Sequence, residues 1–485
     1  MRSKNLITKA NIILFIILVV AAVLRLYTLA SESFWLDELH TMKETNPNGG
    51  SWGDLIHTLQ TSDVHPPLFY VMERLSLKMF GFDEWGARIL PAIAGIFCVW
   101  AIYLLGKEIL NKSLGLIAAA VLAVNYYNIL FSQEARDYTF LWLFTTLSYL
   151  FFLKLCKRLK TIDAIWWVIS TVLLLYSHYY SLIVLICQGV LFAIFFFTEK
   201  ENKKRFFTIF AISAVAIIVL YSPWIPAMRA ASKIQSFWSA PVEQNFYLLY
   251  FNEYFGYSAF LNFFLYLFVI SFIVNVMLEY SPTNDLKSNP VIFSFIFVFI
   301  SIFLSYSIPY IRGVLVVPML VTRYTIIMVP SLILAIAFGI QLIKTPIVRY
   351  IFLTLFVSFS VFHLVKVRHY YSNAEKEQFR EVTQVVTSQP SHHLLINGLT
   401  GWHQSYYLQK FGYRGRLIEG WRDASIDSII RRDGSFATTD TFWVVGAHGD
   451  PHLDSAVQTS LDSVFVRLQD TTLIETWAQL YARKK

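Results

Sequence analysis

Two adjacent carboxylates, Asp37 and Glu38, are the residues best suited to acid–base chemistry. A carboxylate within hydrogen-bond reach of a hydroxyl can act as its general base. On a helix, neighbouring side chains point about 100° apart, so the two acids cannot face one ligand equally. The alternative is a pair of solvated loop carboxylates. We favour a functional pair because Trp35 and Leu39 flank it close to a long apolar run, where idle charge is costly.

Two arginines, Arg88 and Arg136, are the best candidates for neutralising a phosphate group. Both are expected at the ends of membrane spans, on the same side as Asp37. The alternative for Arg88 is a side chain that snorkels from a helix end. The alternative for Arg136 is an ion pair with Glu134 or Asp137.

Two histidines lie near acidic residues of the same predicted face. Asp63 and His65 precede two prolines, and His178 lies in a short turn. Imidazole and carboxylate ligands together suit several divalent ions. Glu38, Asp63 and His178 are therefore the open candidates for a metal site, with hydrogen-bonded scaffold as the alternative for a lone histidine. The sequence makes no cofactor certain.

The composition requires a membrane. Of the 485 residues, 56% are hydrophobic and 15% are charged, whereas soluble domains have about 45–50% and 25%. This excludes an ordinary soluble enzyme, a disordered protein and a nucleic-acid binder. We expect an all-α polytopic protein with about eleven spans. They are residues 10–30, 88–105, 114–131, 138–154, 162–177, 180–197, 207–224, 259–279, 291–309, 324–342 and 350–366.

The loops predict an orientation. Basic residues are concentrated in loops that share the side of the N-terminus, with Lys154, Lys157, Arg158 and Lys160 as the clearest group. The positive-inside rule then predicts a multi-pass plasma-membrane protein with a cytoplasmic N-terminus. The compact loops favour the bacterial inner membrane. An odd number of spans places residues 367–485 outside.

We expect two domains, a transmembrane domain at 1–366 and an extracytoplasmic domain at 367–485. Within the first, the outer loop 31–87 contains two amphipathic stretches that predict interfacial helices. In the second, short apolar runs at 394–397, 416–420 and 441–446 predict strands, and 373–387 predicts a helix. The second domain should therefore be a small α/β domain.

Four motifs in order resemble the GT-C superfamily of polyprenyl-phosphate-sugar-dependent glycosyltransferases. The motifs are Ser33–Glu38, Asp63–Leu68, Ala87–Pro91 and Ser132–Tyr138. The branch that they resemble contains the protein O-mannosyltransferases and the lipid A aminoarabinose transferase.

The resemblance implies that Asp37 acts on the sugar acceptor, with Glu38 beside it. It places His65 near the donor phosphate or a metal, and it implies that Arg323 and Tyr324 also bind phosphate. The remaining matches imply supporting roles and are Asp63, Glu134, Tyr138 and His178.

Together these features predict a glycosyltransferase, a hexosyl or pentosyl transferase. It would transfer a sugar from a polyprenyl-phosphate donor to a hydroxyl or phosphate of a glycan, lipid or protein on the extracytoplasmic side. One carboxylate acting as base without a covalent intermediate implies inversion at the anomeric carbon. The alternatives are a multi-pass transporter and a non-catalytic lipid- or glycan-binding membrane protein. The predicted partners also include membrane lipids but no nucleic acid.

Overall fold

A computed structural model describes most of the chain in two units. The described residues are 9–63, 65–199, 201–233, 245–279, 289–318, 320–389, 393–398, 402–420, 422–450 and 452–485. The first unit comprises Met1–Tyr27, Gly50–Gly81 and Gly86–His369, and the second comprises Thr28–Gly49, Phe82–Trp85 and Tyr370–Lys485. The second unit thus adds two pieces of the loop 31–87 to the C-terminal region.

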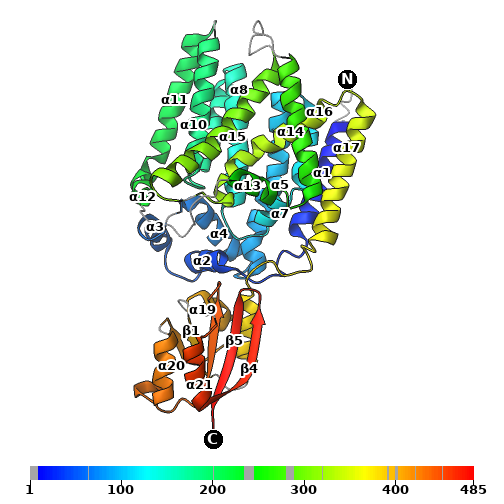
Figure 1. Cartoon of the computed structure of the whole chain (residues 1–485). Coiled ribbons are helices and arrows are strands. Elements are labelled where there is room, and N and C mark those ends of the chain that lie inside the picture. Colours follow the sequence, from blue (N-terminus) through cyan, green and yellow to red (C-terminus); the bar gives the residue numbers. More distant parts are fainter. Residues whose placement is uncertain are drawn as a thin grey trace, which may run out of the picture. The chain divides into compact units, whose positions relative to one another are not determined.

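The first unit is helical throughout its described part (Figure 1). Its α-helices are α1 (Lys9–Leu26), α3 (Trp52–Thr61), α4 (Pro67–Phe80), α5 (Glu84–Ile109), α6 (Lys112–Ala123), α7 (Tyr126–Ser132), α8 (Tyr138–Arg158), α9 (Thr161–Leu175), α10 (Ser181–Thr198), α11 (Lys203–Tyr221), α12 (Ile225–Ala231), α13 (Phe246–Tyr254), α14 (Ala259–Glu279), α15 (Pro290–Leu315), α16 (Val329–Gln341) and α17 (Pro346–Phe362). The short helices are η1 (Ser222–Trp224), η2 (Thr322–Met328) and η3 (His363–Val367).

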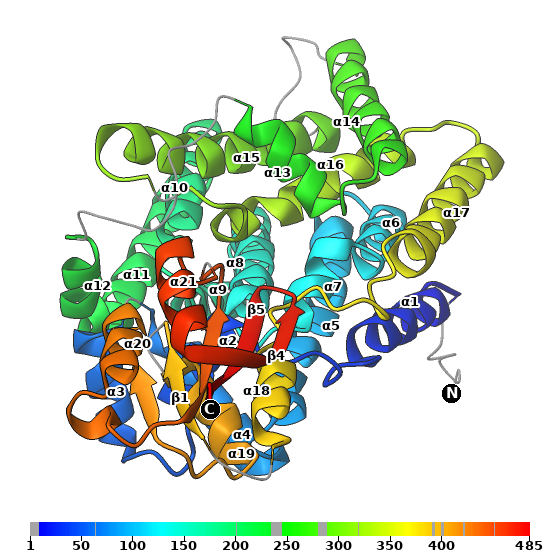
Figure 2. The ribbon, with the colours of Figure 1, turned by 60° about the horizontal axis from the view of Figure 1, so that its bottom comes forward.

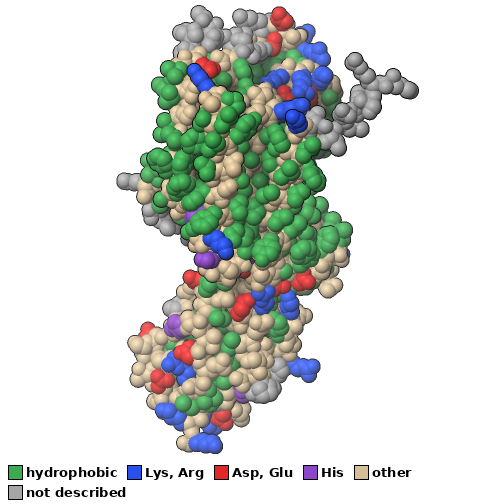
Figure 3. All heavy atoms as spheres, turned by 90° about the vertical axis from the view of Figure 1, so that its right-hand side faces the viewer, with side chains coloured by type: hydrophobic (Ala, Val, Ile, Leu, Met, Phe, Trp, Pro, Cys, Tyr) green, Lys and Arg blue, Asp and Glu red, His purple; other side chains and the backbone are tan. Residues whose placement is uncertain are grey.

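The helices confirm a polytopic membrane fold. Within the described residues, nine helices are long and apolar enough to cross a membrane, or ten when α6 and α7 count as one bent span. The span predicted at 162–177 corresponds to the shorter apolar helix Thr161–Leu175. Hydrophobic side chains cover the visible face of this unit, and Lys and Arg gather towards one of its ends (Figure 3).

The helices differ in how much protein surrounds them. Helices α5, α6, α7 and α8 lie towards the middle of the unit, and α1, α11 and α17 lie at its edge (Figure 2). The apolar stretches of α5 and α8 are mostly buried, whereas those of α1, α11 and α17 are mostly exposed. A lipid-facing helix is expected to leave its apolar surface uncovered by protein.

A buried arginine accounts for the 62° bend between α6 and α7. Arg25 is fully buried and donates to the carbonyls of Leu122 and Ala123 at 3.1 and 3.0 Å, where α6 ends. It also donates to Asn128 Oδ1 on α7, at 2.7 Å from Nη2. The last carbonyls of a helix need partners from elsewhere. Arg25 supplies them and joins the two halves of the bend.

The amphipathic helix predicted after Pro66 is confirmed as α4. Its side chains Met72, Leu75 and Met79 are 37%, 41% and 74% exposed, although all three are apolar. Phe69 and Tyr70, on the opposite side, are buried. This distribution is typical of a helix that lies in a membrane interface.

The second unit contains one five-stranded sheet within its described residues. Its helices are α2 (Leu36–Glu44), α18 (Phe379–Thr387), α19 (Trp402–Lys410), α20 (Arg422–Arg431), η4 (Gly434–Phe436) and α21 (Ser455–Val464). Its strands are β1 (Leu394–Asn397), β2 (Leu417–Glu419), β3 (Thr441–Ala447), β4 (Phe465–Leu473) and β5 (Thr476–Arg483).

The sheet order is β2-β1-β3-β5-β4, and it confirms the predicted α/β class. β1 pairs in parallel with β2 and β3, while β5 is antiparallel to β3 and β4. Apolar residues of α20 and α21 pack on one face, and those of α18 and α19 pack on the other. With both faces covered, β3 is an almost unbroken apolar strand.

Candidate active site

The predicted site residues belong to both units. Asp37 and Glu38 lie on α2 in the second unit. Eight further site residues belong to the first unit. They lie in the loop before α4, in the segment from α7 to the start of α8, in the turn before α10 and at the start of η2. They are Asp63, His65, Glu134, Arg136, Tyr138, His178, Arg323 and Tyr324. Arg88 lies near the start of α5.

Three of the predicted residues form a hydrogen-bonded chain. His65 Nδ1 lies 2.5 Å from Asp63 Oδ1, and His65 Nε2 lies 3.1 Å from Arg136 Nη2. A guanidinium can only donate, so His65 Nε2 accepts and Nδ1 carries the proton that is donated to Asp63. His65 is therefore a neutral imidazole that links the Asp63 carboxylate to the Arg136 guanidinium. The chain fixes the direction in which a buried cation points.

Asp137 is a site residue that the sequence analysis treated only as a partner for Arg136. Its side chain is 2% exposed, and neither carboxylate oxygen accepts a hydrogen bond from the described residues. Buried carboxylates are rarely left in this state. The electrostatic environments of Tyr70 and His178 both include Asp137 and Arg136, so Asp137 belongs to the same cluster. Its adjacency to Arg136 was the only signal in the sequence.

His178 connects this cluster to the start of η2. Its ring lies 5.2 Å from that of Tyr324, and its Nδ1 accepts the backbone N–H of Tyr180 at 3.1 Å. Burial lowers the pKa of His178 to about 4, with Arg136 and Arg323 among the nearby charges. The ring is therefore neutral at pH 7, with its proton on Nε2.

Arg323 brings a second cation to this end of the unit. The guanidinium lies 5.9 Å from the Tyr324 ring. Glu253, which the sequence analysis did not single out, accepts from the Thr322 hydroxyl at 2.5 Å and is electrostatically coupled to Arg323. Burial raises the pKa of Glu253. The structure thus groups Arg136 with His65 and Arg323 with Glu253.

The other predicted residues in the first unit are also buried. Arg88 is 1% exposed, which does not fit a side chain that snorkels into solvent. Tyr138 is 1% exposed and its ring lies 5.9 Å from the Arg136 guanidinium. Glu134 is 6% exposed, and its backbone carbonyl accepts from the Arg136 N–H at 2.8 Å.

Asp37 and Glu38 differ sharply in their surroundings. Asp37 is partly exposed on the first turn of α2. Glu38 is fully buried, and its Oε2 lies 3.3 Å from Lys376 Nζ in an ion pair. Of the two, Asp37 has the exposure that a general base requires, while Glu38 is held inside the second unit.

The residues do not fit the predicted metal site in this arrangement. Asp63 is engaged by His65, Glu38 by Lys376, and His178 Nδ1 by a backbone N–H. Across the described residues, no three His, Cys, Asp or Glu side chains are arranged to hold a metal ion.

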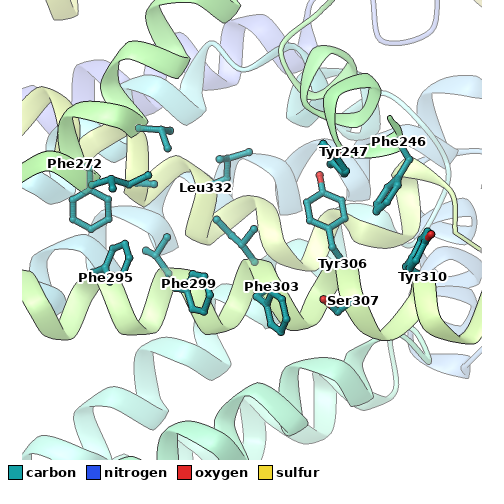
Figure 4. Close-up of a pocket in the computed structure, with 15 residues that line it drawn as sticks. Phe246, Tyr247, Phe272, Phe295, Phe299, Phe303, Tyr306, Ser307, Tyr310 and Leu332 are labelled. Atoms are coloured by element: carbon teal, nitrogen blue, oxygen red, sulfur yellow. The ribbon is translucent and has the colours of Figure 1, made fainter. Parts of the chain in front are cut away.

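A large apolar groove lies among α13, α14, α15 and α16. Its volume is about 630 Å³. Aromatic rings line it along α15, with Phe272 and Phe295 towards one end and Phe246, Tyr306 and Tyr310 towards the other (Figure 4). The ring of Tyr250 lies 6.3 Å from that of Tyr306.

Tyr250 also connects this groove to the polar cluster. It contributes to the electrostatic environment of Tyr180, whose ring lies 5.1 Å from that of Tyr324. One end of the apolar groove thus adjoins the residues around Arg323.

Comparison with known proteins supports the predicted resemblance. The family of dolichyl-phosphate-mannose-protein mannosyltransferases matches residues 64–226. A curated relative from Pyrococcus horikoshii, dolichyl-phosphooligosaccharide-protein glycotransferase 1, is 33% identical over 165 residues. That match covers 32% of this chain, and it spans only 16% of the length of the relative.

Solved structures extend the likeness to nearly the whole chain. ArnT from Cupriavidus metallidurans in the apo state has a TM-score of 0.59 and 10% identity, and the match covers 97% of both chains. The chain has the GT-C fold. The GT-C fold is also seen in the apo oligosaccharyltransferase of Archaeoglobus fulgidus, with a TM-score of 0.57, 11% identity and coverage of 92% of this chain and 70% of that one.

Two further structures show ligands bound to such GT-C proteins. ArnT has been solved with undecaprenyl phosphate, at a TM-score of 0.57, 10% identity and 97% coverage of both chains. The Archaeoglobus oligosaccharyltransferase has been solved with Zn and sulfate, at a TM-score of 0.52, 12% identity and coverage of 90% of this chain and 68% of that one. Those ligands belong to the neighbours.

Proposed function

We propose that this GT-C chain is a membrane glycosyltransferase that uses a polyprenyl-phosphate sugar. It would transfer the sugar to a hydroxyl or phosphate of a glycan, lipid or protein on the extracytoplasmic side of the plasma membrane. The observation that carries the proposal is the Asp63–His65–Arg136 chain, which aims a buried guanidinium, with Arg323 in the same electrostatic cluster. A buried guanidinium (Arg136) and a partly buried one (Arg323) suit a phosphate, and the adjoining apolar groove suits an isoprenoid tail.

The proposed reaction assigns a role to each group. Asp37 takes the proton from the acceptor hydroxyl as its oxygen attacks the anomeric carbon. The bond from that carbon to the phosphate oxygen breaks, and Arg136 and Arg323 stabilise the charge on the departing polyprenyl phosphate. A single displacement inverts the anomeric configuration. Asp137 would accept hydrogen bonds from hydroxyls of the bound substrate.

The test is sugar transfer by the purified full-length protein. Polyprenyl-phosphate sugars extracted from the native membrane serve as donors, and the envelope fraction provides acceptors. We expect Arg136→Gln to lower kcat/KM for the donor at least about tenfold, which corresponds to about 1.4 kcal/mol. The matched control is Arg229→Gln, because Arg229 is exposed on α12 of the same unit. An Arg136→Gln protein with unchanged donor kinetics would overturn the phosphate assignment.

A further inference from the structure

The C-terminal region holds the first turn of α2, the helix that carries Asp37. The helix is only nine residues long, and the residue that precedes it, Trp35, makes no side-chain capping bond. The backbone N–H of Leu36, the first residue of the helix, has no acceptor within the helix. It donates to Glu377 Oε2 at 2.8 Å instead. A carboxylate at this place also complements the positive end of the helix dipole. Glu377 therefore serves as a cap supplied from more than three hundred residues away.

Glu377 is itself held in place. Its Oε1 is hydrogen-bonded to His448 Nδ1 in the loop after β3. Its backbone carbonyl accepts from the Ser33 hydroxyl at 2.5 Å. One residue thus connects the segment before α2, the start of α2 and the carboxyl end of β3.

The neighbouring residue makes a second connection. Lys376 Nζ lies 3.3 Å from Glu38 Oε2, and the two side chains are 9% and 0% exposed. The same oxygen accepts from the Trp35 N–H at 3.4 Å. Because this pair is buried, removing one partner would leave an uncompensated charge inside the protein.

An aromatic contact fixes the approach to the helix. The Phe34 N–H donates to the Tyr407 hydroxyl at 2.7 Å, and the Phe34 ring packs edge-on against Tyr406 with centroids 5.4 Å apart. Asp37 therefore lies between two residues, Leu36 and Glu38, that are each bound by the C-terminal region. Since adjacent helical side chains point about 100° apart, Asp37 is directed away from the Glu38–Lys376 pair.

We infer that Lys376 and Glu377 are positioning residues for Asp37, and that the C-terminal region is part of the catalytic apparatus. This inference rests on the proposed function, in which Asp37 is the base. In this view Glu38 is structural, and its charge matters only because Lys376 is opposite it. Neither Lys376 nor Glu377 would touch the substrate.

The test compares kcat and KM for sugar transfer by full-length variants. We expect Lys376→Gln to lower kcat at least about tenfold while the donor KM changes less than about threefold, because the base is misdirected but the donor site is intact. Lys376→Arg should retain most of the activity. The matched control is Arg422→Gln, which breaks the Arg422–Asp450 ion pair of the same region and should keep kcat within about twofold.

A double variant separates loss of positioning from loss of folding, because it leaves no unpaired buried charge. Glu38→Gln combined with Lys376→Gln removes both buried charges, so it should fold and recover kcat relative to Lys376→Gln alone. If the double variant folds but is no more active than Lys376→Gln, Glu38 acts directly and the inference is wrong.

Asp37→Asn separates the inference from the proposed function. If Asp37→Asn is inactive while both Lys376→Gln and Glu377→Gln have wild-type kcat, the positioning inference is wrong and the proposed function stands. If Asp37→Asn has wild-type activity, the proposed base is wrong, and the positioning role fails with it.

Discussion

At the scale of single residues, hydrogen-bond chemistry decides what each histidine can do. His65 accepts a hydrogen bond from a guanidinium, so it must be neutral. Its other nitrogen is hydrogen-bonded to Asp63, so Asp63 orients the ring that positions Arg136. His178 accepts a backbone N–H at Nδ1, so that nitrogen has no lone pair left for a metal. The two histidines look alike in the sequence, but one orients a cation and the other supports a turn.

The lowered pKa of His178 predicts an acid-sensitive fold. Its folded pKa of about 4 lies below the ordinary value of 6.5. Between these values the unfolded chain binds more protons, so stability is fully present above about pH 6.5 and falls as the pH is lowered towards 4. We expect His178→Asn to reduce the drop in melting temperature between pH 7.5 and pH 5, measured in detergent.

The control for this experiment is His57→Asn. His57 is exposed on α3, so its substitution should leave the pH dependence as in the wild type. The assignment would be wrong if His178→Asn and the wild-type protein lost the same stability on acidification.

At the scale of elements, the bend between α6 and α7 brings the segment Gln133–Asp137 to the site. Arg25 maintains that bend by donating to two carbonyls of α6 and to Asn128 of α7. Arg25→Met should leave these acceptors unsatisfied inside the bundle, at a cost of about 1–3 kcal/mol for each buried group. We expect a markedly lower melting temperature in detergent, with Arg25→Lys in between because lysine lacks the planar fork.

Lys9→Met is the comparison for Arg25. Lys9 is exposed at the start of the same helix, and its loss should be nearly neutral. An Arg25→Met protein that melts like the wild type would show that the bend does not depend on this arginine.

The elements also show what sequence could predict. Long apolar runs predicted most of the spans correctly, because the apolar length of a membrane helix can be recognised without its packing partners. The strands at 394–397 and 441–447 were predictable because buried parallel strands are continuous apolar runs. The short strand at 417–419 was also predicted, although none of its residues is buried. β4 was missed because most of its side chains are exposed, which removes the apolar pattern.

The predicted helix at 373–387 begins only at Phe379. The preceding residues, Lys376 and Glu377, instead contact Glu38 and Leu36. Pairings between residues so distant in sequence have no local signature. For the same reason the sequence indicated that Asp37 and Glu38 are important but not which one is partly exposed and which one is buried.

At the scale of the whole molecule, each unit contributes a different part of the proposed chemistry. The first unit provides the Arg136 and Arg323 guanidinium groups and the apolar groove, which suit a lipid phosphate. The second provides the partly exposed carboxylate of Asp37 on a helix that is capped from the C-terminal region. We therefore expect that substitutions can impair donor binding and catalysis separately.

The most direct test of the account is sugar transfer by Asp37→Asn, which keeps the shape of the side chain but removes the base. General base catalysis contributes about 10²–10⁴-fold, so turnover should fall at least about 100-fold while the melting temperature and donor binding stay near wild type. Asp427→Asn, an exposed substitution in the same unit, is the control. Wild-type transfer by Asp37→Asn with loss in Glu38→Gln would move the base to Glu38, and wild-type transfer by both would contradict the proposed mechanism.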